Sequence, residues 1–189
     1  MNLNGAGEAR EIAWGEFYAL YSPVIVRFAR SFGVRGSDAD EIVADVLGNF
    51  FQASPNFVYD AGKGRFRGYL KTCTVRAIAR NSQRRNRETA VDPISLDAEA
   101  PAVDDAWNKA WKRERLQRAI ESVRKQFLSR PESVKTFRAF EMNVLLGQPA
   151  KSVADELGVE PNGVHVAKSR VSAAIRNELA KKDALLGEE

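Results

Sequence analysis

The sequence is poor in the residues that disulfides, metal sites and membrane helices require. Its 189 residues include one cysteine, Cys73, and one histidine, His165, so an intramolecular disulfide is impossible and a Cys/His zinc site is implausible. No apolar run reaches the roughly 18 residues that a membrane helix needs, and the first residues lack the apolar core of a signal peptide. We therefore expect a soluble, cytoplasmic protein that holds no metal or cofactor and has no membrane partner.

Catalytic motifs are missing as well. The sequence has no phosphate-binding Gly-Lys motif and no Ser/His or Cys/His pairing. Asp38, Asp40, Glu41 and Asp45 could bind a metal in principle, but four acids on one predicted helix, without a histidine or a second acidic helix, are typical of a solvated surface. A helical hydrolase or nuclease is thus a poor interpretation, and we expect no enzymatic activity and no small-molecule substrate.

Apolar residues at helical spacing are what the chain does have. Hydrophobic residues make up 44% of it, a normal value for a globular protein, and no stretch shows the alternation of a β-strand. The pattern predicts an all-α protein, with Pro23 kinking or dividing the first helix. The expected helices cover about 12–28, 38–52, 65–86, 105–129, 131–147, 149–157 and 161–180.

Charge is distributed in blocks of opposite sign. The net charge is +4, but residues 62–87 hold nine basic residues and no acid, whereas residues 88–106 hold six acids and no base. The second block also contains Pro93 and Pro101 and lacks helical periodicity, which favours an extended acidic linker. We predict two helical domains, 8–88 and 107–182, joined by a linker over 89–106.

The most specific local pattern is a predicted helix-turn-helix between residues 150 and 176. Gly158 stands where the turn needs a residue that tolerates positive φ, and Pro161 suits the first turn of the following helix. The exposed face of that helix carries donors and acceptors suited to base edges and phosphates. The candidate DNA-contacting residues are Asn162, His165, Lys168, Ser169, Arg170 and Arg176. A helical hairpin with an ordinary solvated face remains the alternative for this segment taken alone.

Both halves together resemble the sigma-70 family of bacterial transcription-initiation factors, specifically the extracytoplasmic-function type that keeps only regions 2 and 4. The resemblance covers about residues 10–88 and 112–182. It is carried by five segments in order: Phe17-Tyr-Ala-Leu-Tyr21, Asp38-Ala-Asp-Glu-Ile-Val-Ala-Asp-Val46, Phe66-Arg-Gly-Tyr-Leu70 through Ile78-Ala-Arg-Asn81, Val153-Ala-Asp-Glu-Leu-Gly158 and Val166-Ala-Lys-Ser-Arg-Val171.

The resemblance implies two partners, core RNA polymerase and promoter DNA, and a role for each surface. The predicted helix 38–52 resembles the surface that docks on the polymerase, with Asp38, Glu41, Asp45, Asn49 and Phe50 as its candidate contacts. The predicted helix 65–86 and the loop before it resemble the part that melts and reads the −10 promoter element. Its candidate contacts are Lys63, Arg65, Phe66, Tyr69, Lys71, Arg76, Arg80, Asn81, Arg84 and Arg85. The helix-turn-helix would read the −35 element. An anti-sigma factor is a usual further partner of such proteins, and the sequence identifies none.

A second interpretation is a helix-turn-helix regulator of another type, in which residues 1–88 form a sensing or dimerisation domain. The basic block weighs against this interpretation, because a sensor has no need for nine bases without an acid over 62–87.

Overall fold

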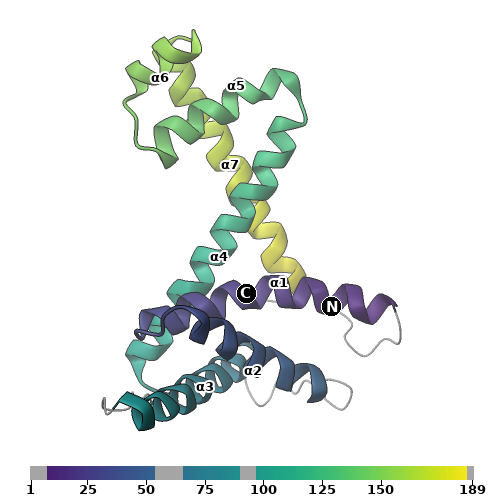
Figure 1. The fold of residues 1–189 in the computed structure, drawn as a ribbon. Helices are drawn as coiled ribbons and strands as arrows, with labels where there is room; N and C mark the ends of the chain where they lie inside the picture. Colours follow the sequence, from purple (N-terminus) through teal and green to yellow (C-terminus); the bar gives the residue numbers. More distant parts are fainter. Residues whose placement is uncertain (1–7, 54–65, 90–96, 187–189) are drawn as a thin grey trace. The chain divides into compact units, whose positions relative to one another are not determined.

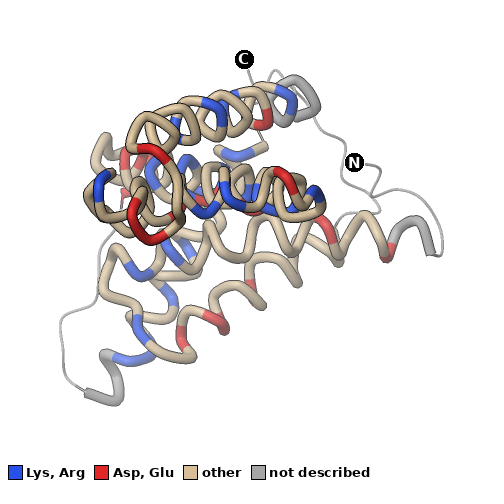
Figure 2. Tube along the Cα trace, turned by 90° about the horizontal axis from the view of Figure 1, so that it is seen from above, with Lys and Arg blue, Asp and Glu red and all other residues tan. Residues whose placement is uncertain are grey.

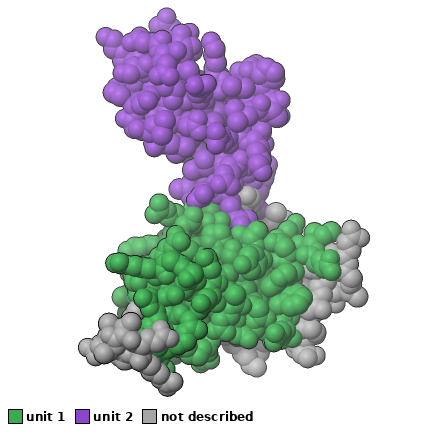
Figure 3. Space-filling view, in the orientation of Figure 1, with its two compact units in different colours: residues 1–114 green, residues 115–189 purple. Residues whose placement is uncertain are grey.

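The structure of the protein is a computed structural model that describes residues 8–53, 66–89 and 97–186 (Figure 1). Within these ranges the chain is helical and contains no strand, which confirms the all-α prediction. The chain forms two compact units, Met1–Glu114 and Arg115–Glu189 (Figure 3). Each unit has its own core and is described separately.

The first helix, α1, runs without interruption from Glu8 to Ser31, with Pro23 inside it. Of the two effects predicted for Pro23, a kink or a division of the helix, the division does not occur. Tyr21 and Val24, on either side of the proline, are both buried in the same core. Their burial offsets the roughly 3 kcal/mol that an interior proline costs a helix. Gly33, at φ +82°, reverses the chain after α1.

Helices α2 (Ser37–Ala53) and α3 (Phe66–Thr89) complete most of the first unit, where α2 contacts both α1 and α3. The apolar stripe predicted for α2 is buried as expected, with Ile42, Val43 and Leu47 each at most 2% exposed. Leu70 and Ile78 of α3 are completely buried. Acids of α2 pair with arginines of α3, and Figure 2 marks the acidic and basic residues along the trace.

Helix α4 (Pro101–Leu128) begins inside the segment expected to be an extended linker. Of that segment, Thr89 belongs to α3, 90–96 lie outside the described residues, and 97–100 form a turn that leads into α4. The first half of α4 packs into the first unit: Trp107 and Trp111 are 3% and 1% exposed, and their rings contact Phe28 and Tyr21. The first compact unit accordingly extends to Glu114, not to 88.

The second unit contains the end of α4, helix α5 (Pro131–Phe140), a π-helical turn (Glu141–Leu145), helix α6 (Ala150–Leu157) and helix α7 (Pro161–Leu186). The backbone of Gly158, at φ +62°, ends α6 as predicted, and Pro161 begins α7 as predicted. Val164, Ala167, Val171 and Ile175 form the buried stripe of α7. This packing fixes which face of α7 stays in contact with solvent.

Candidate nucleic-acid interface

An ion-pair ladder joins the charged faces of α2 and α3. Arg80 binds Asp45 at 2.6 Å and Arg85 binds Asp38 at 2.7 Å, and Arg84 pairs with Glu41 between them. The acids recur at helical spacing on α2, and their partners follow in reverse order on α3, as two antiparallel helices require. All six side chains were predicted to contact partners, the acids the polymerase and the arginines DNA. In this structure they contact each other.

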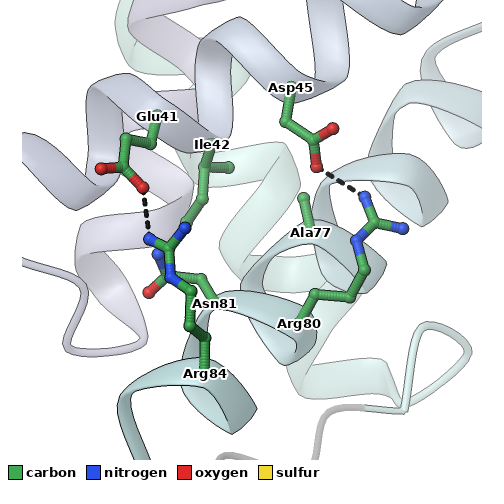
Figure 4. A pocket seen from close by; sticks show the side chains of 7 residues that line it. All are labelled: Glu41, Ile42, Asp45, Ala77, Arg80, Asn81 and Arg84. Atoms are coloured by element: carbon green, nitrogen blue, oxygen red, sulfur yellow. Dashed lines mark hydrogen bonds and ion pairs between the residues drawn. The ribbon is translucent and has the colours of Figure 1, made fainter. Parts of the chain in front are cut away.

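A shallow cavity of about 250 Å³ lies within the ladder. Ile42 and Ala77 form its apolar floor, and Asn81 lies beside the Arg84 side chain (Figure 4). The side chain of Asn49, one turn further along α2, donates a hydrogen bond of 2.6 Å to Asp45. The cavity is therefore lined by both signs of charge, and an anion that entered it would meet carboxylates as well as guanidinium groups.

The start of α3 is paired with α4 instead. Lys71 pairs with Asp104, and the Lys71 side chain is 13% exposed. Arg67 donates a 3.1 Å hydrogen bond to Asn108 and lies 4.6 Å from the ring centroid of Trp111. A lysine that is this well buried and paired has little surface left for DNA, so the structure does not favour Lys71 as a backbone contact. Lys63 and Arg65 lie outside the described residues.

The aromatic residues predicted to contact partners divide into core and surface. Phe50 is 3% exposed and packs against the rings of Phe17 and Phe66, so it is a core residue and its assignment to the polymerase-binding surface was wrong. Phe66 is partly buried against the same core. Tyr69 is 42% exposed, and its ring centroid lies 6.0 Å from that of Phe66. Tyr69 is thus the aromatic ring on α3 that a base can reach.

The phenol of Tyr69 is held in its neutral form. Partial burial, reinforced by a hydrogen bond with the Cys73 thiol, raises the pKa of Tyr69 above its ordinary value of 10.0, against the opposing charge of Arg76. Arg76 itself is exposed one turn beyond Cys73. A neutral, partly exposed ring beside a cation can stack on an unpaired base without adding negative charge near the phosphates.

The exposed face of α7 carries all six predicted contacts of the second unit. Asn162, His165, Lys168, Ser169, Arg170 and Arg176 are each exposed. Among the described residues, none of these six side chains forms an ion pair. These six residues therefore lie on the solvent-exposed side of α7 and, within the described ranges, none is paired with an acid as Arg80, Arg84 and Arg85 of α3 are.

Sequence reasoning missed a set of contacts between α4 and the rest of the first unit. Glu114 is 5% exposed and pairs with Arg27 of α1. The signals were present: Val103, Trp107 and Trp111 share one helical face, and Pro101 with Asp104 in the first turn is a typical helix start. In the described residues no group of His, Cys, Asp and Glu side chains could hold a metal ion, and no helix has the length and hydropathy of a membrane span.

The comparison with known families is consistent with this geometry. Residues 17–88, which contain most of α1 and all of α2 and nearly all of α3, match the family model Sigma-70 region 2. No curated protein and no solved structure matches the chain. Residues 17–88 are therefore similar to sigma-70 region 2, and this similarity covers less than half of the chain.

Proposed function

We propose that the chain is a sigma factor of the extracytoplasmic-function type, which binds core RNA polymerase and directs it to promoters through two DNA-reading surfaces. The observation that carries this proposal is the region 2 match together with the charged faces of α2 and α3 and the exposed ring of Tyr69. The chain itself would catalyse no reaction. It would act in the cytoplasm, where the polymerase and the chromosome meet.

For the −10 element, the proposed readers are on α3. Melting requires capture of unstacked bases, and a base–aromatic stack contributes about 1–3 kcal/mol. Tyr69 offers an exposed ring, and Arg76, Arg80, Arg84 and Arg85 continue along α3 at or near helical spacing with exposed side chains. Arginines in such a row would hold successive phosphates of the adjacent duplex.

The polymerase would dock on the acids of α2, of which Glu41 and Asp45 are exposed and Asp38 is partly exposed. Asp38, Glu41 and Asp45 form one stripe, and Asn49 extends it. Such a stripe fits a basic partner surface. Phe50 lies in the apolar core against which α2 packs, so it would support this surface without contacting the polymerase.

The second unit would read the −35 element. α6 and α7, joined at Gly158, have the spacing of a helix-turn-helix, whose second helix enters the major groove. Asn162, His165 and Lys168 lie near the start of α7, where recognition helices contact base edges. We place this second domain after Glu114, because the first half of α4 belongs to the core of the first unit.

Complex formation with core polymerase tests the proposal. The purified chain is mixed with core RNA polymerase and passed over a size-exclusion column. We expect a stoichiometric complex that the variant E41Q/D45N weakens and the variant D40N/D105N does not. A helix-turn-helix regulator of another type would form no such complex. An anti-sigma factor would be sought in the same way, by co-purification with the chain from its native cells.

A further inference from the structure

The ion-pair ladder links two surfaces to which the proposed function assigns different partners. Asp38, Glu41 and Asp45 would face the polymerase, and Arg80, Arg84 and Arg85 would face DNA. Both sets cannot fully serve their partners while they are paired with each other. An arginine whose charge is matched by a carboxylate at 2.6–2.7 Å presents a much weaker field to a phosphate.

Each ion pair of the ladder can separate at a low cost in free energy. The side chains of Arg80 and Asp45 are 61% and 42% exposed, and those of Arg84 and Glu41 are 58% and 55% exposed. In the third pair Arg85 is 52% exposed and Asp38 is 21% exposed. Ion pairs at this exposure are weak and are screened by salt. Beneath them Ile42 and Ala77 are buried, so the helix backbones stay in place when the charged ends exchange partners.

We propose that the ladder couples the two binding events. In the free chain the α2 acids hold the α3 arginines and lower the affinity for DNA. When a basic partner surface engages the acids, the arginines are released to phosphates. Because binding free energies are reciprocal, DNA on α3 raises the affinity of α2 for the basic partner by the same factor. The identity of the partners rests on the proposed function, whereas the effect of the acids on DNA binding can be measured without the polymerase.

The chain supplies a control for net charge. Asp40 is exposed on α2 but lies outside the ladder, and Asp105 is exposed on α4. The variant E41Q/D45N removes two rungs, and the variant D40N/D105N changes the net charge by the same amount. Asp38 and Asp40 both lie in the first turn of α2, so the single variants D38N and D40N are matched for the helix dipole as well.

The experiment titrates the free chain into a fluorescein-labelled duplex DNA at about 50 mM salt and again at about 200 mM salt. We expect E41Q/D45N to bind about threefold to tenfold more tightly than the wild type at the lower salt concentration, and D40N/D105N to differ by less than about twofold. The gap between the two variants should narrow at the higher salt concentration. D38N should raise the affinity for DNA more than D40N does.

Equal affinities of the ladder and control variants would overturn the coupling, and so would a ladder variant that binds DNA more weakly than the wild type or not at all. Circular dichroism establishes that each variant is folded, and D38N with D40N replaces the double variants if one is not. Since no polymerase is present, failure here leaves the complex with core polymerase intact. Loss of that complex alone would instead contradict the proposed function.

Discussion

The two surfaces with exposed basic residues hold their charge in different ways. On α3, Arg80, Arg84 and Arg85 are paired with acids of α2, and Lys71 is paired with Asp104 of α4. On α7 the basic residues extend into solvent and, in the part of the chain that the structure describes, take part in no ion pair. The two surfaces therefore differ in how readily their basic residues can bind a phosphate: those of α7 can do so directly, whereas Arg80, Arg84 and Arg85 of α3 must first leave their carboxylate partners.

The largest effect is expected from the packing of Trp111, on α4, into the core of the first unit. Replacing Trp111 with Ala should lower the free energy of unfolding by about 3–5 kcal/mol, because the ring is 1% exposed and stacks on Tyr21. Urea unfolding followed by circular dichroism measures it. Leu116, 45% exposed on the same helix, is the control, and its replacement by Ala should cost less than about 1 kcal/mol. If both substitutions lowered the free energy of unfolding by a similar small amount, α4 would not be packed against the first unit. The start of α3 would then be as accessible to solvent as α7.

Next in size is the loss of DNA affinity when the α3 arginines are removed. The variant R80A/R84A/R85A should weaken DNA binding and reduce the slope of log affinity against log salt by about 0.9 for each phosphate that the variant no longer neutralises. The control K109A/K112A/R113A removes the same charge from exposed positions on α4. If both variants give the same slope of log affinity against log salt, the α3 arginines do not contact DNA, and α3 is not a DNA-binding surface to compare with α7.

A smaller and more selective effect is expected on α7. Replacing Asn162 or Lys168 with Ala should change the preferred −35 sequence, since a well-placed base contact is worth about 1–3 kcal/mol of discrimination. Transcription from a library of upstream sequences measures the preference. The matched substitution on α3, R85A, should instead weaken all sequences alike. A uniform loss in the α7 variants would make that helix a backbone contact only.

The smallest effect is the energy of a single rung. A double-mutant cycle on Asp45 and Arg80 should give a coupling of about 0.2–1 kcal/mol in stability at low salt, which declines as salt is raised. The measurement is urea unfolding of the two single variants and the double variant. No coupling at low salt would mean that the two side chains are as independent as those on α7.

The sequence predicts the helices well because burial dictates them. The apolar stripes of α2 and α7 repeat at helical spacing, and Gly158 and Pro161 mark a turn whose backbone requirements few residues meet. It predicts the start of α4 poorly. The acids and prolines over 88–106 suggest an extended chain. The burial of Trp107 and Trp111 in the core of the first unit instead stabilises a helix that begins at Pro101.

The sequence predicts which charged residues share a face of α2 and of α3, but it does not predict that the two faces pair with each other. Helical spacing puts Asp38, Glu41 and Asp45 on one stripe, but nothing local reveals which helix lies opposite. The antiparallel register of α2 and α3, set by their shared apolar core, brings those acids to the arginines. Phe50 shows the same limit, because its position next to the acidic stripe does not reveal that its ring points into the core.

Transcription from an unbiased template tests the central claim most directly. Core RNA polymerase and sheared genomic DNA from the source organism are incubated with and without the chain, and the 5′ ends of the transcripts are sequenced. We predict a set of start sites that appears only with the chain and shares sequence elements upstream. The same 5′ ends with and without the chain would contradict its assignment as a sigma factor.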